Sequence, residues 1–203
     1  LGTEGCGFEQ HLESMRRALS EDKNPGFLRD NAFLAVIFIQ DEDDCSSSNG
    51  AVFDGALGDS VDSEFGEYSS FRCFEYGTVC EPDNERTLGP RTDCVPDEES
   101  AYMEKVTTYI DFLKGVKDDP SKVIVAAITA PPTPGVVSID QSRDQLWTTP
   151  SCVVCDGGGT DCPGAVGSAT DDDDETLVAA RPGIRMNAFL NGFPQRSTFQ
   201  SIC

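Results

Sequence analysis

Residues 33–44 read FLAVIFIQDEDD, an apolar run that passes through one glutamine into four consecutive acidic residues. The apolar part has the length of a β-strand and no polar alternation, which is typical of a strand buried on both faces. Residues 123–128, VIVAAI, show the same pattern further along the chain. We therefore predict two buried strands of the kind found in parallel sheets.

Helical patterns surround these two strands. In residues 8–20 the apolar positions Phe8, Leu12, Met15 and Leu19 form one stripe. Two further helices are predicted over residues 98–116, with Asp97 as the N-cap, and from Pro182 to Phe193; residues 197–202 are predicted to form a short last strand. Helices that alternate with buried strands predict an α/β fold, with a Rossmann-like, mostly parallel sheet and right-handed crossovers.

Two long segments interrupt this alternation. Residues 41–97 and 130–181 are rich in glycine, serine, aspartate, proline and cysteine and show no sustained period. Their apolar content is too small for a core of their own, so we expect disulfides to hold them. The chain is thus predicted to be a single domain, residues 1–203, with two cysteine-rich insertions.

The charge of the chain limits its partners. Its 36 acidic and 15 basic residues give a formal net charge of −21. Such a surface repels nucleic acids and anionic lipids but attracts cations, of which calcium is abundant outside cells. The simpler interpretation is that the acidic residues keep an extracellular protein soluble. The run Asp171–Asp174 is interpreted as a solvated loop.

Nine cysteines indicate an oxidising compartment. Zinc is the alternative, but the chain has one CxxC (Cys152 and Cys155) and one histidine, so disulfides are favoured. Because nine is odd, one cysteine is free or pairs outside the chain. Spacing suggests Cys73 with Cys80, and Cys152 or Cys155 with Cys162.

The acidic residues after the first strand form a candidate metal site. Ligands of open parallel sheets bind at the carboxyl ends of the strands, and hard cations prefer oxygen ligands. Spacing alone leaves two interpretations equally open, a cation site and an acidic loop in water.

Signals of catalysis are weak. His11 is the only histidine and is interpreted as a surface residue on the polar side of its helix. Nucleophile-elbow, zinc-protease and phosphate-loop motifs are absent from the sequence. The CxxC pair could act in thiol redox chemistry, but a structural disulfide is favoured because no helix pattern follows it. We expect a protein that is not an enzyme.

Three segments resemble a known family. Residues 5–10 (GCGFEQ), 24–29 (NPGFLR) and 38–46 (FIQDEDDCS) are similar to the later half of a von Willebrand factor A-like domain. More narrowly, they resemble uncharacterised bacterial cell-surface lipoproteins. The resemblance is strong over residues 5–46 and weak over residues 130–180.

The resemblance implies a cell-surface or secreted adhesion module that binds Mg²⁺ or Ca²⁺. It places Asp41 in the last ligand position of the family's metal site and Thr3 in a second, with Asp43 as a further candidate. The resemblance implies that the family's DxSxS motif, which follows the first strand of the complete domain, lies upstream of this chain, and Gln40 replaces the threonine that often precedes the aspartate.

The resemblance also implies that residues 1–203 are a partial domain, the later half of one, and that strand 33–39 is central in the larger sheet. We expect upstream residues or another chain to pair with it, because it would otherwise expose an apolar edge. The expected partner is a protein or surface ligand, not nucleic acid, and the expected location is extracellular, at the cell surface, in the periplasm or at the bacterial outer membrane. No apolar run of about 18 residues predicts a membrane span. The first residues do not have the pattern of a signal peptide, so we expect a mature or processed form of an exported protein, or a fragment.

Three functions follow from these patterns. The first is a cation-dependent binding module, the second is a structural subunit of an extracellular assembly in which no metal takes part, and the third is a thiol oxidoreductase that uses Cys152 and Cys155.

Overall fold

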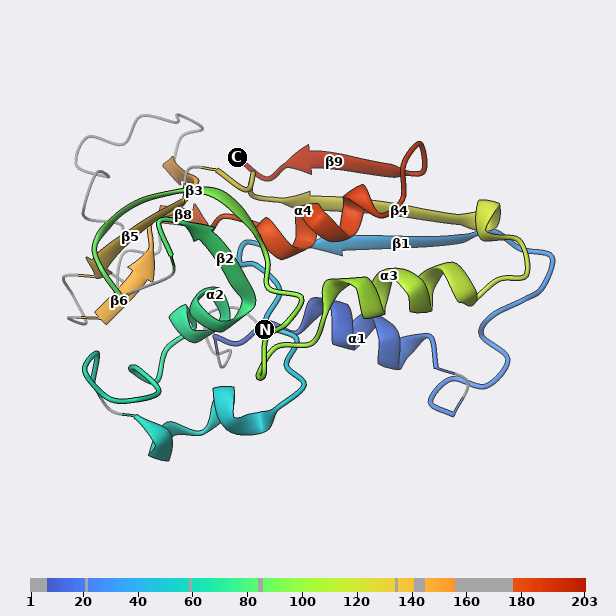
Figure 1. Ribbon diagram of the computed structural model, residues 1–203. Coiled ribbons are helices and arrows are strands. Elements are labelled where there is room, and N and C mark those ends of the chain that lie inside the picture. The colour runs from blue at the N-terminus through green and yellow to red at the C-terminus, as the bar shows by residue number, and fades with distance from the viewer. Residues whose placement is uncertain are drawn as a thin grey trace.

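The computed structural model describes residues 7–20, 22–58, 60–83, 86–133, 135–140, 145–155 and 177–203. Its main layer is a three-stranded parallel sheet (Figure 1), whose strands follow the order β1 (Leu34–Ile39), β4 (Val123–Thr129), β9 (Ser197–Ser201). This confirms the predicted strands and their parallel pairing. Within the described residues β4 is the middle strand and β1 lies at an edge.

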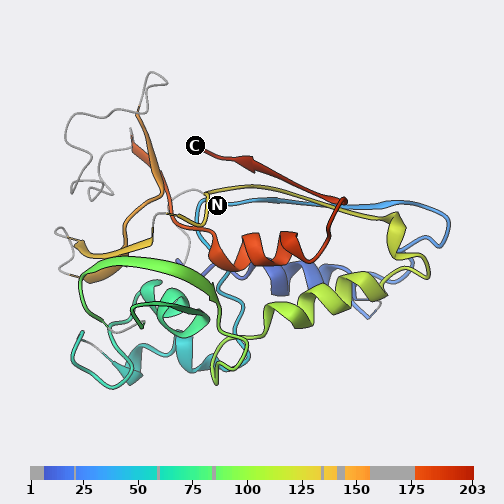
Figure 2. The same cartoon turned by 45° about the horizontal axis from the view of Figure 1, so that its top comes forward.

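Three helices cover the same face of this sheet, as Figures 1 and 2 show. They are α1 (His11–Ala18), α3 (Val106–Gly115) and α4 (Ile184–Asn191). The main core lies between helices and strands and includes Leu12, Phe38, Tyr109, Leu113, Val123, Val125, Met186 and Phe189. The predicted mixed α/β character is therefore confirmed.

The predicted start of α3 was wrong. The helix begins at Val106, after the N-cap position Lys105, and not next to Asp97. The carboxylate of Glu98 accepts hydrogen bonds from the backbone N–H groups of Val106 and Thr107, at 3.2 and 3.4 Å. A distant glutamate thus satisfies the first donors of the helix, a contact that spacing along the sequence does not reveal.

The opposite face of the parallel sheet is not covered by a helix among the described residues (Figures 1 and 2). In a parallel ladder, paired residues point to the same face, and the pairs here are Ala35 with Ile124, Ile37 with Ala126, and Ile39 with Ile128. Ile37 is 64% exposed and Ile39 is 69% exposed. We call these six residues the open face. It is unusual because parallel sheets are normally covered on both sides.

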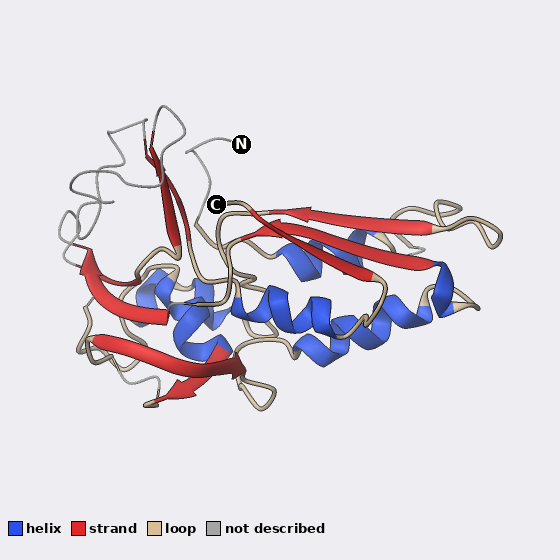
Figure 3. Cartoon of the chain, turned by 90° about the horizontal axis from the view of Figure 1, so that it is seen from above, coloured by secondary structure: helices blue, strands red, loops and turns tan. Residues whose placement is uncertain are grey.

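The two insertions form a second sheet, which the sequence did not predict (Figure 3). Its antiparallel strands follow the order β2 (Thr78–Glu81), β3 (Gly89–Pro96), β5 (Gly135–Asp140), β6 (Gln145–Thr148). The first insertion also contains α2 (Phe71–Gly77), and β7 (Cys152–Cys155) pairs with β8 (Leu177–Ala180). Short 3-10 turns lie at Gly50–Phe53, Gly55–Leu57 and Pro120–Lys122. The fold therefore combines a parallel sheet with an antiparallel one.

Two disulfides cross-link the first insertion, Cys45–Cys73 and Cys80–Cys94. The predicted Cys73–Cys80 pair is therefore wrong. Cys73 lies on α2 and faces the end of the acidic loop, whereas Cys80 lies on β2 beside its partner strand β3. Secondary structure between the two cysteines separates them, although their spacing is short.

Oxidised cysteines favour an oxidising compartment, and Cys203 is disulfide-bonded as well. Cys6 and Cys162 lie outside the described residues, as do the side chains of Cys152 and Cys155. In the described parts of the chain, each helix is too short or too polar to cross a membrane.

A buried arginine organises the segment between the two sheets. Arg72 is 1% exposed and uses all five of its N–H donors on backbone carbonyls. The acceptors are the carbonyls of Glu67, Val52, Asp54, Gly58 and Gly66, at 2.7 to 3.2 Å. A side chain at Gly58 would collide with the Gly66 carbonyl, so only glycine fits there. This segment is thus held by hydrogen bonds as well as by disulfides.

Candidate functional site

The acidic loop after β1 lies at the carboxyl end of the parallel sheet, where the sequence predicted a site. Asp43 faces the amino end of α4 and accepts hydrogen bonds from the backbone N–H groups of Arg185 and Met186, at 2.8 and 3.1 Å. Burial raises the pKa of Asp43 to about 6, and these amide donors act in the opposite direction. Asp43 therefore works as a helix cap, in which both carboxylate oxygens are occupied.

Asp44 is fully buried and joins two helices to the loop. Its carboxylate accepts hydrogen bonds from the backbone N–H of Leu12 at 2.9 Å and from the hydroxyl of Ser46 at 2.6 Å. It also forms an ion pair with Arg185 at 3.2 Å, in which the side chains are 0% and 1% exposed. A buried carboxylate with this many donors has a structural role.

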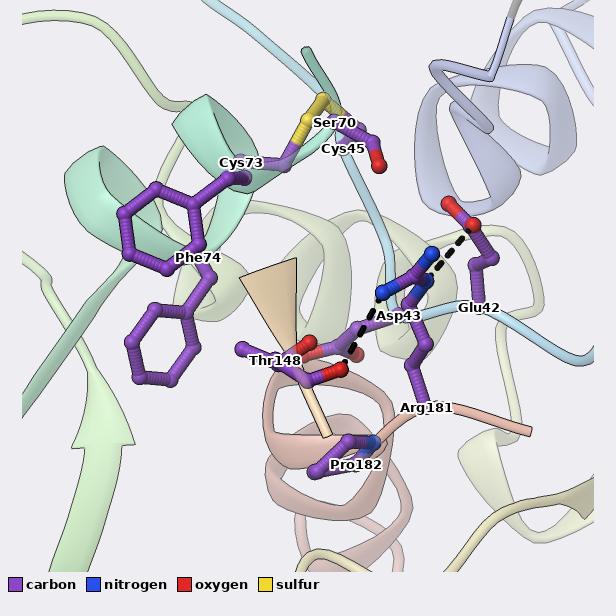
Figure 4. Close-up of a pocket in the computed structure, with 10 residues that line it drawn as sticks. Glu42, Asp43, Cys45, Ser70, Cys73, Phe74, Thr148, Arg181 and Pro182 are labelled. Carbon is purple, nitrogen blue, oxygen red and sulfur yellow. Dashed lines mark hydrogen bonds and ion pairs between the residues drawn. A yellow bond between two sulfur atoms is a disulfide. The ribbon is translucent and has the colours of Figure 1, made fainter. Parts of the chain in front are cut away.

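Glu42 is held by Arg181, as Figure 4 shows. The guanidinium donates to the Glu42 carboxylate at 2.9 Å and to the Thr148 carbonyl at 3.1 Å, and it stacks over the Trp147 ring at 4.9 Å. The cavity drawn in Figure 4 has a volume of about 30 Å³. Ligand pockets usually have volumes of about 300 Å³ or more, so this cavity is small for one.

Asp41 lies on the exposed side of the acidic loop, and the half-buried Glu9 lies near it. The Asp41 side chain is exposed, and the Asp41 backbone carbonyl accepts a hydrogen bond from the backbone N–H of Arg181 at 2.7 Å. Burial raises the pKa of Glu9, and the nearby carboxylates of Glu42 and Asp41 raise it further. Glu9 Oε2 is buried without a hydrogen-bond partner among the described residues. We call Glu9, Asp41 and Glu42 the acidic end of β1.

His11 is not the solvated surface residue that the sequence suggested. It is the first residue of α1, and its Nδ1 is buried without a partner in the described part of the chain. Burial lowers the pKa of His11, although the carboxylates of Asp44, Asp41 and Glu42 oppose this shift. The imidazole therefore adds no positive charge at pH 7 to the acidic residues around it.

A large groove lies between α1 and β1. Its volume is about 700 Å³, and its lining includes the residues of β1 together with Met15, Ala18, Leu19 and Phe27. Phe27 is 60% exposed, and Glu9 lines the groove where it meets the acidic end. This groove runs along the unpaired edge of β1 and borders the open face, so two apolar surfaces meet at one strand.

The structure describes two of the three residues that were predicted as metal ligands, Asp41 and Asp43. Asp41 and Asp43 lie on the same loop, but the oxygens of Asp43 face α4. Thr3 and the Asp171–Asp174 run lie outside the described residues. Within the described ranges, no group of three or more His, Cys, Asp or Glu side chains is arranged to hold a metal ion.

Sequence reasoning missed the residues that organise this site, Glu9, Arg181 and Arg185. A signal for Arg185 exists, since it is the one charged residue of α4, in a chain whose acidic loop needs a counter-charge. Glu9 shows no such signal, because only the fold brings it next to Asp41 and Glu42.

Comparisons with protein-family models, with curated proteins and with solved structures found no match.

Proposed function

We propose that this chain is a non-enzymatic binding module of an oxidising compartment, and that it binds a polypeptide partner at β1. The observation that carries the proposal is the coincidence of three features on one strand. β1 has an unpaired edge within the described residues, it contributes half of the open face, and it lines the 700 Å³ groove.

Exposed apolar patches of this kind mark interaction sites on soluble proteins. The carboxylates at the end of β1 do not offer an obvious catalytic arrangement, because Asp43 and Asp44 are used as structural acceptors. The resemblance of residues 5–46 to von Willebrand factor A-like domains also supports binding over catalysis.

The test places a photo-crosslinking side chain at Ile37, on the open face, in the cells that make the protein. The matched control is Val95, which is 54% exposed on β3. Position 37 should form an adduct with one discrete polypeptide that, once purified, also binds the unmodified chain; position 95 should not. Identical products from both positions, or a purified polypeptide that fails to bind, would overturn the proposal.

A second candidate function is divalent-cation binding at the acidic end, with Asp41 as a ligand. The observation that favours it is the crowding of Glu9 by Glu42 and Asp41, which a cation would relieve. Thr3 belongs to the same predicted ligand set. Asp43 fits this role less well, because both of its oxygens accept hydrogen bonds from α4.

A further inference from the structure

The unpaired edge of β1 offers backbone hydrogen bonds in a regular row. The backbone N–H of Gln40 donates to Ile128 on β4 at 3.0 Å. Since the hydrogen-bonding groups of a strand alternate in direction, those of Val36 and Phe38 also face β4, and those of Ala35, Ile37 and Ile39 face away from it. The outward groups have no strand partner among the described residues.

The side chains around this edge suit an extended apolar segment. The open face lies on one side of the edge, with Ile37 and Ile39 beside it, and the α1 groove lies on the other. A strand added next to β1 would place alternate side chains against these two apolar surfaces. Both pairings already present in this sheet are parallel, which favours a parallel addition.

The two ends of the β1 edge also differ in the charged residues that lie near them. Its carboxyl end carries Glu9, Asp41 and Glu42. Near its amino end, Lys122 donates to the Asp30 carbonyl at 3.1 Å and Lys117 donates to the Arg29 carbonyl at 2.6 Å. A parallel partner strand with a basic residue near its own carboxyl end would place that residue at the acidic end. The reverse strand would place it at the other end, where Lys117 is buried and Lys122 lies beside Asp119.

We propose that the occupant of the β1 edge is an extended apolar segment of a different polypeptide, which adds as a parallel strand and carries lysine or arginine near its carboxyl end. This inference rests on the proposed function and specifies its partner. A second copy of the chain is disfavoured because each copy has a net charge of −21, and because a two-fold axis would make the two β1 strands antiparallel.

The probes are short synthetic peptides of alternating valine and threonine, as long as β1. One ends in lysine at the carboxyl end, a matched one ends there in glutamate, and the amino ends are blocked. Binding is followed by fluorescence anisotropy, and backbone amide exchange is followed residue by residue by NMR.

The lysine peptide should bind about tenfold more tightly than the glutamate peptide, and added salt should reduce the difference. It should slow exchange at Ala35, Ile37 and Ile39 while leaving Val36 and Phe38 unchanged. A nitroxide at the amino end of the peptide should broaden signals near Lys122 and not near Asp41. The variants D41N and E9Q should remove the preference for lysine.

Each departure from this pattern has a defined meaning. Binding without protection of the outward amides would overturn strand addition, while the proposed function would stand if Ile37 still cross-links to its partner. Broadening near Asp41 would overturn the parallel direction. A dimer of the chain in sedimentation, with the same amides protected, would replace the foreign segment with a second copy. Failure of both the peptides and the Ile37 cross-link would overturn both proposals.

Discussion

The Arg185 guanidinium contacts the Asp44 carboxylate at 3.2 Å in a region that water does not reach. Removing one member of a buried pair leaves the other charge uncompensated, at a cost of about 3 to 5 kcal/mol. D44N should lower the free energy of unfolding in urea by that amount. The control E99Q, at the exposed Lys105–Glu99 pair, should change it by less than about 1 kcal/mol. Equal effects of the two variants would contradict the structural role of Asp44.

The disulfide pairing can be tested directly by mass spectrometry of an unreduced digest. It should contain cross-linked peptides for Cys45–Cys73 and Cys80–Cys94, and none for Cys73–Cys80. Alanine at both Cys45 and Cys73 should lower the free energy of unfolding by about 3 to 4 kcal/mol, because the lost cross-link spans 28 residues. Alanine at Cys80 and Cys94, which span 14 residues, should cost somewhat less.

The titration of Asp43 should make the folded protein less stable as the pH rises, which is the reverse of the usual effect of an acidic residue. Its pKa is about 6 in the folded protein against an ordinary value of 3.8, so the folded state holds the proton more tightly. The contribution of Asp43 to stability is thus complete below about pH 4 and should be lost as the pH rises through about 6. D43N removes this titration. The free energies of unfolding of the wild-type protein and of D43N are measured in urea from about pH 4 to pH 7. The wild-type protein should lose stability relative to D43N as the pH rises; a difference that stays constant would refute the raised pKa of Asp43.

Divalent cations provide a test of the second candidate function. If Asp41 is a ligand, Ca²⁺ or Mg²⁺ should raise the melting temperature of the wild-type protein, and D41A should abolish the increase. The control D62A changes an acidic residue far along the chain from this loop. Melting shifts that persist in D41A would move the site elsewhere, for instance to Asp171–Asp174.

The open face should limit solubility more than stability. Threonine at both Ile37 and Ile39 keeps β-branched side chains and removes apolar surface from water, so aggregation measured by light scattering should fall. The free energy of unfolding should change by less than about 1 kcal/mol, because both positions are more than half exposed. The control F38T, at a buried neighbour on the same strand, should cost about 3 kcal/mol or more. An unchanged tendency to aggregate would argue that another surface is responsible.

The parallel sheet could be predicted because two of its strands, β1 and β4, are almost wholly apolar. The antiparallel sheet could not, because β2 and β6 are only four residues long and because β3 pairs with β5, which lies in the other insertion. Such short strands carry too few alternating positions for a pattern to emerge. The pairing of β3 with β5 depends on contacts that only the complete fold supplies.

The position of the acidic loop was predictable, but the use of its carboxylates was not. Composition alone cannot separate Asp41, which is exposed, from Asp44, which is buried against Arg185. The difference arises because α4 and α1 approach the loop from the side of Asp43 and Asp44. For the same reason the small loop suggested for Cys73 and Cys80 was wrong, since α2 and β2 direct those two cysteines to different neighbours.

Arg72 occupies the place that a bound calcium ion takes in many extracellular loops, at the centre of a ring of backbone carbonyls. A guanidinium is built into the chain and keeps its charge throughout the physiological pH range. The ring of carbonyls around Arg72 therefore needs no ion from the surroundings. Chelators and changes in calcium concentration should leave its hydrogen bonds intact. Residues 52–58 and 60–67 should therefore keep their arrangement around Arg72 whether or not calcium is present.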